Sequence, residues 1–274
     1  MNKHFLKILF VVATILFALP TMAQTTASKN VSTFTIDAPK LDTIKKIWIY
    51  LPESYNTSNK KFPVLYLQDA QNLFNAHISY AGEWKVDEAL DSLKLDLIVI
   101  GIEHGNEKRV DELTPFPHPE HKGGKANDYL EFILKTLKPK VDSLYNTSTI
   151  AENTFIGGSS LGGLFSYYAT LKHPDVFGKA IIFSPSFWYS EDIFDLTESI
   201  KSNSFSKTEL YFRAGEKESE TMVPLMFKMK ELLSCKLNSE AQLNIASIPN
   251  GEHNEALWAK VFPDAALWLL ELDK

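Results

Sequence analysis

The sequence lacks the features of disulfide-rich and nucleic-acid-binding proteins. It contains one cysteine in 274 residues, Cys235, so no internal disulfide can form. Leu232 and Leu233 next to it predict that this thiol lies on the inner side of a helix as a small core residue. The formal net charge is −6, which makes a polyanion such as nucleic acid a poor partner. There is also no internal repeat, low-complexity tract or interdomain linker.

No hydrophobic run is long enough to span a membrane, and the longest run lies near the start of the chain. Lys3 and Lys7 precede an apolar run at residues 8–19, and the sequence Thr-Met-Ala ends at Ala23. This order is typical of a secretory signal peptide, residues 1–23. An uncleaved membrane anchor is the alternative, but it would need roughly 20 apolar residues. We expect a mature chain without stable membrane insertion, in the periplasm or secreted.

The mature chain, residues 24–274, alternates between two kinds of segment. Stretches rich in β-branched and aromatic residues predict strands at 46–51, 62–67, 95–102, 154–157, 179–183, 209–213 and 242–248. Segments with helical spacing predict helices at 127–144, 161–171, 222–237 and 254–272. Several strands are apolar throughout, so we expect an α/β fold in one domain, with a mostly parallel central sheet and helices on both faces. In such sheets ligands bind outside the carboxyl ends of the strands.

A glycine-rich turn joins the strand predicted at 154–157 to the helix predicted at 161–171. It contains Gly158-x-Ser160-x-Gly162. Small residues two positions either side of the serine avoid a collision where strand and helix cross, and they leave the hydroxyl exposed at the sheet edge. A turn without chemistry is the alternative, but the strand and helix on either side favour a nucleophile. We therefore predict an α/β-hydrolase fold with Ser160 as nucleophile and the amide of Leu161 as one oxyanion donor.

The partners of this serine must follow it, because α/β hydrolases order their triad as Ser, acid and His. Of the two downstream histidines, His173 ends the helix after the turn, roughly 20 Å from the nucleophile at ~1.5 Å per residue. His253, between the last strand and the last helix, is the predicted general base; a solvated surface histidine is the alternative. Glu216 and Glu218 compete as the acid after strand 209–213. Glu218 is preferred because a short turn usually precedes the acid.

The loop after the strand at 62–67 is expected to supply the second oxyanion donor. The amide of Gln71 is the predicted donor, and Asn72 beside it is a candidate substrate contact. Ordinary turn polarity explains both residues equally well. Trp188 follows the strand at 179–183 and is a further candidate substrate contact, with a buried packing role as the alternative.

The polar stretch at residues 103–125 is expected to be a loop beside the site. His118 and His121 flank Glu120 in it, which raises the question of a metal site. A loop rich in proline and glycine fixes no ligand geometry, so we predict a solvated loop and no metal.

Taken together, these motifs resemble the putative esterase family of α/β hydrolases, which includes enterochelin-esterase-like, feruloyl-esterase-like and esterase D enzymes. Ala70 stands where glycine is usual in that pattern. The resemblance implies a serine esterase without metal or organic cofactor, and it supports Ser160 and His253. The matching pieces are residues 65–74, 83–87, 101–103, 158–164, 184–188 and 251–254, with Arg109, Glu112 and Pro115.

The sequence thus predicts an exported serine esterase that hydrolyses a small-molecule or glycan-linked carboxylic ester through an acyl-enzyme. Siderophore esters, feruloyl or acetyl esters of polysaccharides and small acyl esters are all open as substrates. An acyltransferase of the same superfamily would use the same acyl-enzyme with a sugar as acceptor. A binding protein that kept the fold and lost catalysis is the alternative from a different class.

Overall fold

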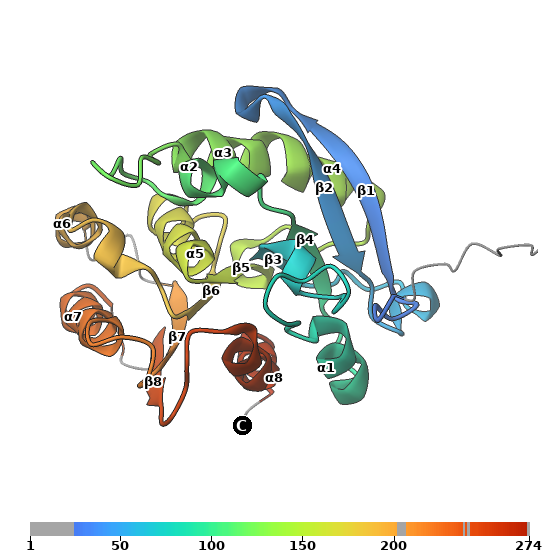
Figure 1. Ribbon diagram of the computed structural model, residues 1–274. Coiled ribbons are helices and arrows are strands. Elements are labelled where there is room, and N and C mark those ends of the chain that lie inside the picture. Colours follow the sequence, from blue (N-terminus) through green and yellow to red (C-terminus); the bar gives the residue numbers. More distant parts are fainter. Residues whose placement is uncertain (1–24, 202–206, 238, 240–241, 273–274) are drawn as a thin grey trace, which may run out of the picture.

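An eight-stranded sheet forms the centre of the computed structural model, which describes residues 25–201, 207–237, 239 and 242–272 (Figure 1). The predicted signal peptide lies outside the described residues. The strand order is β1-β2-β4-β3-β5-β6-β7-β8. β2 pairs antiparallel with both β1 and β4, and all later pairs are parallel. The strands are Val31–Ala38 (β1), Thr43–Tyr50 (β2), Val64–Gln68 (β3), Ile98–Ile102 (β4), Thr154–Ser159 (β5), Lys179–Phe183 (β6), Glu209–Gly215 (β7) and Leu243–Ile248 (β8).

Helices cover both faces of the sheet (Figure 1). α1 and α8 pack on one face, and the remaining helices lie on the other. A π-helical turn, Ile133–Leu137, links α3 to α4 and makes one continuous helical segment. The helices are Val86–Leu93 (α1), Arg109–Leu113 (α2), Ala126–Phe132 (α3), Lys138–Leu144 (α4), Leu161–Lys172 (α5), Asp192–Ser199 (α6), Met222–Ser234 (α7) and Glu255–Leu269 (α8).

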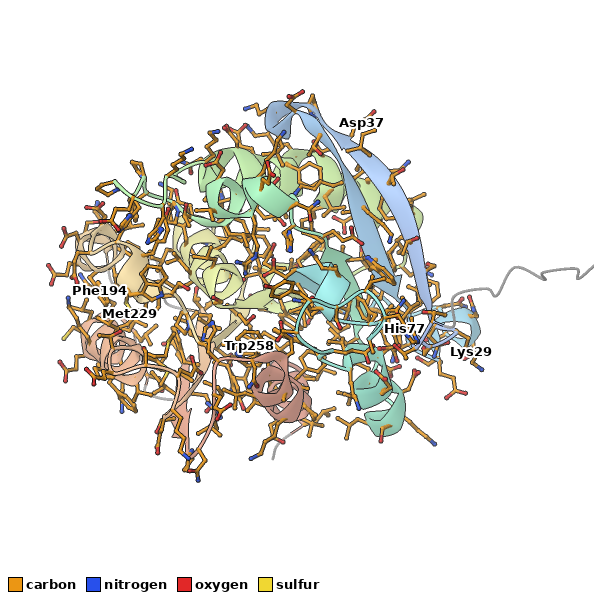
Figure 2. All side chains as sticks on the ribbon, viewed as in Figure 1. Lys29, Asp37, His77, Phe194, Met229 and Trp258 are labelled. Carbon is orange, nitrogen blue, oxygen red and sulfur yellow. The ribbon has the colours of Figure 1, made fainter. Side chains whose placement is uncertain are left out.

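The central strands read as continuous apolar runs because side chains on both of their faces are buried. In β3, Tyr66 faces the core under α3 and α5, whereas Leu65 and Leu67 face the core under α1 and α8. The first core extends under α6 and α7 to Phe194 and Met229 (Figure 2). The expected mostly parallel sheet with helices on both faces is therefore confirmed.

Two local expectations are wrong. The stretch at 103–125 is not entirely loop, because α2 forms within it. Cys235 is exposed and is not a core residue. The buried residues of α7 are Met222, Met226, Met229 and Leu233, three or four positions apart, and Cys235 lies two positions after Leu233, off this buried face.

Within the described part of the chain, no helix has both the length and the apolar character needed to cross a bilayer.

Candidate active site

The residues that follow the parallel strands meet at one edge of the sheet, because parallel strands share a carboxyl edge. Ser160 comes directly after β5, and Ser184 directly after β6. Glu218 follows the end of β7, and His253 follows the end of β8. Four adjacent strands thus deliver a hydroxyl, a second hydroxyl, a carboxylate and an imidazole to neighbouring positions.

Ser160 occupies a strained turn between β5 and α5. Its backbone has φ 56° and ψ −123°, a conformation that non-glycine residues rarely adopt and that occurs at functional turns. The turn is tight: a Cβ on Gly158 would lie 2.7 Å from the backbone of Gly162, so only glycine fits. Leu161 is the first residue of α5, and amides in a first helical turn have no acceptor within the helix. The turn therefore offers a hydroxyl and nearby amide donors at the sheet edge.

Glu218 and His253 are in direct contact. Oε2 of Glu218 lies 2.7 Å from Nδ1 of His253, and the glutamate side chain is only 1% exposed. The other carboxylate oxygen accepts hydrogen bonds from the hydroxyl of Ser184 at 2.6 Å and from the amide of Gly215 at 2.5 Å. A carboxylate held this way can fix the orientation and the tautomer of the imidazole. Glu216 instead accepts a hydrogen bond from Ser247 at 2.8 Å.

Trp258 of α8 contacts both Ser184 and His253. Its indole N–H donates to the hydroxyl of Ser184 at 2.9 Å. Its ring lies edge-on to that of His253, with the ring centroids 5.1 Å apart. The imidazole is therefore held by a carboxylate on one side and an aromatic ring on another.

The hydroxyl of Ser160 points toward another serine. Its Oγ lies 3.3 Å from Oγ of Ser186, whose backbone amide also donates to the carbonyl of Ser160. Within the described residues, the Ser160 hydroxyl forms a side-chain hydrogen bond with Ser186 but none with His253. Catalytic hydrogen bonds are often long in the free enzyme and tighten when substrate binds.

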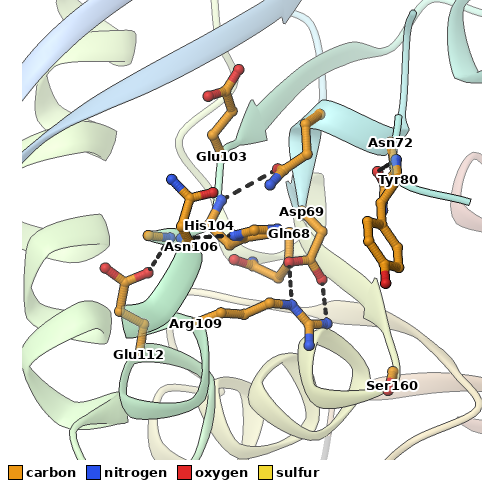
Figure 3. A network of polar contacts seen from close by, with 12 residues as sticks. Gln68, Asp69, Asn72, Tyr80, Glu103, His104, Asn106, Arg109, Glu112 and Ser160 are labelled. Atoms are coloured by element: carbon orange, nitrogen blue, oxygen red, sulfur yellow. Dashed lines mark hydrogen bonds and ion pairs between the residues drawn. The ribbon is translucent and has the colours of Figure 1, made fainter. Parts of the chain in front are cut away.

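The loop after β3 is held by an ion pair near Ser160. Both oxygens of Asp69 accept hydrogen bonds from the guanidinium of Arg109, at 2.8 and 2.9 Å (Figure 3). Asp69 has φ 58°, and a 3₁₀ turn, Ala70–Asn72, follows it. The side chain of Gln71 accepts a hydrogen bond from the amide of His104 at 3.4 Å. This loop is thus anchored at both Asp69 and Gln71.

Ala70, at the position where glycine is usual, is accommodated by a glycine in the neighbouring strand. A Cβ on Gly101 of β4 would lie only 2.9 Å from the Cβ of Ala70. The methyl group of Ala70 therefore occupies space that a side chain at position 101 would need.

Asn72 uses both ends of its side-chain amide to join separate segments. Its Nδ2 donates to Glu255 at 3.2 Å, and its Oδ1 accepts from the amide of Tyr80 at 3.0 Å. Glu255 is buried, and burial raises the pKa of its carboxyl; the nearby charges of His253 and Arg109 oppose this rise. As a substrate contact Asn72 stays a prediction, since its described bonds are structural.

A buried ion pair lies beneath the segment at residues 104–106. Nζ of Lys45 lies 2.6 Å from Oε2 of Glu112, which also accepts the amide of Gly105 at 2.9 Å. Burial lowers the pKa of Lys45 and of His104. His104 accepts the amide of Asn106 on Nδ1 at 2.9 Å, a bond that requires this nitrogen to be unprotonated.

An aromatic cluster borders the site on the side of Ser186. Trp188 is 49% exposed, so it is not a buried packing residue. The rings of His118 and His121 stack with centroids 4.6 Å apart, and His121 meets Trp188 edge-on at 5.8 Å. The loop is solvated as expected, with residues 119–122 exposed, and its histidine rings also pack on the segment after β6.

Sequence reasoning gave no individual role to Ser184, Ser186, Asp69, Arg109 or Trp258. Ser184 and Asp69 each stand directly after a parallel strand, so the carboxyl-edge rule could have singled them out. Arg109 and Trp258 carry no such signal, because their contacts depend on how α2 and α8 pack.

Residues 39–269 match the model of the family described as "Putative esterase". The chain belongs to this family. It is a carboxylic ester hydrolase, and the resemblance seen in its sequence motifs is confirmed.

This esterase is similar to proteins from several organisms. It is 29% identical over 241 residues to the uncharacterized protein YbbA of Bacillus subtilis, covering 82% of this chain and 92% of that protein. The BES protein from Bacillus cereus shares its fold with a TM-score of 0.73 and 17% identity, over 98% of this chain and 99% of that one. The enterobactin esterase FES from Shigella flexneri, solved in the presence of enterobactin, has a TM-score of 0.69 and 19% identity, over 91% and 61% of the two chains.

Proposed function

We propose that this esterase works through an acyl-enzyme on Ser160, with His253 as general base. His253 takes the proton of the Ser160 hydroxyl while its oxygen attacks the ester carbonyl. The tetrahedral intermediate collapses, the alcohol leaves with the proton from His253, and the acyl group stays on Ser160. Water, deprotonated by His253, then attacks the acyl carbonyl, and the acid is released as His253 returns the proton to the oxygen of Ser160.

The observation that carries this proposal is the 2.7 Å contact between Glu218 and His253 at the sheet edge where Ser160 stands. Glu218 would hold the imidazole in one tautomer and stabilise the imidazolium that forms during attack. The bonds from Ser184 and Gly215 to its other oxygen support this role, because they fix the carboxylate without neutralising it.

The amides of Leu161 and Gln71 are the proposed oxyanion donors. Leu161 begins α5, so its N–H lies at the positive end of the helix dipole. The Asp69–Arg109 ion pair supports the second donor, because it anchors the residue two positions before Gln71. Each such donor can contribute about 3 kcal/mol to stabilisation of the transition state.

We propose that the enzyme is exported with cleavage after Ala23, and that it acts in the periplasm or outside the cell. The charged start, the short apolar run and the small residues before position 24 support this location.

The proposed substrate is a small-molecule or glycan-linked ester. The exposed indole of Trp188 next to the Ser186 segment supports an ester with a flat or ring-bearing group, because an exposed aromatic face can stack on such a group. Because the similar Shigella protein is an enterobactin esterase, a test panel should include a siderophore ester such as enterobactin. A feruloyl ester and p-nitrophenyl acetate complete the panel.

The test is Ser160→Ala, assayed on p-nitrophenyl acetate and with a fluorophosphonate probe that labels only activated serines. We expect kcat to fall by about 10⁴-fold or more and labelling to vanish, while the thermal melting temperature stays near that of the wild type. Ser159→Ala, one residue away and off the glycine spacing, is the matched control and should retain both signals. Full activity in the Ser160 variant would refute the assignment. A second assay with an added alcohol acceptor separates hydrolysis from acyl transfer.

A further inference from the structure

Two buried residues, Ser184 and Trp258, connect Glu218 to His253 by a second route. Ser184 is 0% exposed and Trp258 is 5% exposed. The hydroxyl of Ser184 lies 2.6 Å from Oε1 of Glu218 and 2.9 Å from the indole nitrogen of Trp258. The ring of Trp258 in turn lies edge-on to the imidazole of His253. With the 2.7 Å contact between Glu218 and His253, the four side chains form a closed ring of contacts.

The direction of the hydrogen bonds in this ring follows from the chemistry of the groups. An indole N–H can only donate, so the hydroxyl oxygen of Ser184 accepts the proton of Trp258. A serine hydroxyl has one proton of its own, and the carboxylate of Glu218 receives it. Because Trp258 occupies the accepting side of the hydroxyl, it directs the hydroxyl proton toward Glu218.

This arrangement determines how the carboxylate of Glu218 is turned. Its Oε1 accepts two hydrogen bonds, from the hydroxyl of Ser184 and from the amide of Gly215. Two donors on one oxygen restrict rotation of the carboxylate about its last side-chain bond. Oε2 is then left facing Nδ1 of His253 at 2.7 Å. A reacting group must be held close to its productive geometry by the residues around it, and Ser184 supplies a side-chain bond that does so.

The backbone of Ser184 is strained in a way that packing alone does not require. Its φ is 44°, in the left-handed region that non-glycine residues rarely adopt and that occurs at functional sites. Its amide donates to the carbonyl of Arg213 at 2.7 Å, which holds this turn at the end of β6. Ser160, at the end of the neighbouring strand β5, also has a positive φ. The sheet edge therefore holds two serines in costly conformations, one of which bonds to Glu218.

We propose that Ser184 and Trp258 are positioning residues for ester hydrolysis. Trp258 orients the hydroxyl of Ser184, and Ser184 orients the carboxylate of Glu218 on the imidazole of His253. Both side chains are buried, so they act through Glu218 and not on the substrate. This inference rests on the proposed function, because it requires Glu218 as the acid and His253 as the base.

Loss of a buried hydroxyl can also weaken a fold without any effect on positioning. The two roles differ in their dependence on Glu218. A positioning residue loses its effect when the charge of Glu218 is absent, whereas a purely structural role costs activity in either background. A double-mutant cycle with Glu218→Gln measures this difference.

Ser184→Ala is therefore made in the mature protein and in its Glu218→Gln variant, and both are assayed on p-nitrophenyl acetate. We expect kcat to fall about tenfold in the first background, with KM within about twofold of the wild type, because a hydrogen bond to a charged group is lost. In the Glu218→Gln background the further fall should be less than about twofold. The same fold loss in both backgrounds would overturn the proposal.

Glu218→Gln alone separates this inference from the proposed function. Loss of activity in Glu218→Gln together with an unchanged kcat in Ser184→Ala would refute the positioning role and leave the proposed mechanism intact. Full activity in Glu218→Gln would refute both, because there would be no acid to position.

Ser247→Ala is the matched control for the serine. Its hydroxyl donates to Glu216 at 2.8 Å, so it makes the same kind of bond to the glutamate that lies two positions before Glu218. We expect kcat within about twofold of the wild type in this variant, as for other surface changes. A tenfold loss there would mean that any serine–glutamate bond in this turn affects activity, which contradicts a specific role for Ser184.

Trp258→Phe tests the other positioning residue, because it keeps an aromatic ring and removes the N–H. We expect kcat to fall about threefold, again only while Glu218 is present. Trp268→Phe on the same helix is its control, since that ring packs on Tyr211 with centroids 5.2 Å apart, and it should keep kcat within about twofold. Should Ser184→Ala fail to fold, the Trp258→Phe cycle replaces it, and equal kcat values for Trp258→Phe and Trp268→Phe would count against the proposal.

Discussion

At the residue scale, Glu216 and Glu218 lie two positions apart and have different surroundings. Glu218 contacts His253, whereas Glu216 turns toward Ser247. The hydrogen bond from the amide of Gly215 folds the turn back so that Glu218 faces the interior. The sequence could propose both residues but could not rank them by contact, because the ranking depends on the path of this turn. The assignment of Glu218 as the catalytic acid stays a prediction.

Comparing Glu218→Gln with Glu216→Gln tests this assignment. We expect Glu218→Gln to lower kcat by about 10²–10⁴-fold, because the imidazole would lose the charge that orients it and stabilises its protonated form. Glu216→Gln should stay within about twofold of the wild type, as a surface change. The measurement is steady-state hydrolysis of p-nitrophenyl acetate by both variants. Equal losses in the two variants would contradict the assignment.

At the element scale, the loop after β3 packs closely on the strand β4 at Gly101, where an added Cβ would lie 2.9 Å from the Cβ of Ala70 and 3.0 Å from Cε2 of Phe74. Ala70 and Gly101 cannot both carry a side chain without movement, since the two Cβ atoms would approach to 2.9 Å. The position of the proposed oxyanion loop is therefore coupled to a glycine in a neighbouring strand.

We expect Gly101→Ala to lower the free energy of unfolding by about 1–3 kcal/mol, because it overpacks this contact, and to reduce kcat by displacing Gln71. Urea denaturation and ester hydrolysis measure the two effects. Ala70→Gly in the Gly101→Ala background should recover part of both losses, since it removes one of the colliding groups. Strictly additive effects in the double variant would show that the two positions are not coupled.

Sequence patterns predicted most elements that are buried on both faces. β2 to β8 were expected because they contain runs rich in β-branched and aromatic residues. β1 was missed because it is an edge strand with only one buried residue among eight, and α2 because it has five residues. α1 and α6 have eight residues each, so they offer little helical periodicity. The sequence was enough to predict Ser160 and His253, because their assignment follows from the order of residues along the chain. It could not reveal the contacts of Arg109 and Trp258, because these depend on how the helices pack.

At the scale of the whole molecule, the described chain begins on the surface of α1. Residues 26–30 bind this helix through the contacts of Ser28 and Asn30. Cleavage after Ala23 would leave a few residues before this contact and would not remove any described strand.

We expect cells that produce the full chain to export a protein whose N-terminus is Gln24. Intact mass measurement of the protein recovered from the periplasm or the medium checks this position. A chain produced without residues 2–23 should fold and hydrolyse p-nitrophenyl acetate but remain in the cytoplasm. Export of the full chain with residues 1–23 still attached would contradict the cleavage.

The arrangement of strands also determines when the enzyme can first act. Ser160 follows β5, but the proposed acid comes after β7 and the proposed base after β8. A nascent chain therefore holds the serine without its base until β8 and the loop after it have been synthesised. With the proposed roles, a partly translated or partly translocated chain cannot attack the cell's own esters. The appearance of activity then indicates that β8, the last strand of the sheet, has paired with β7.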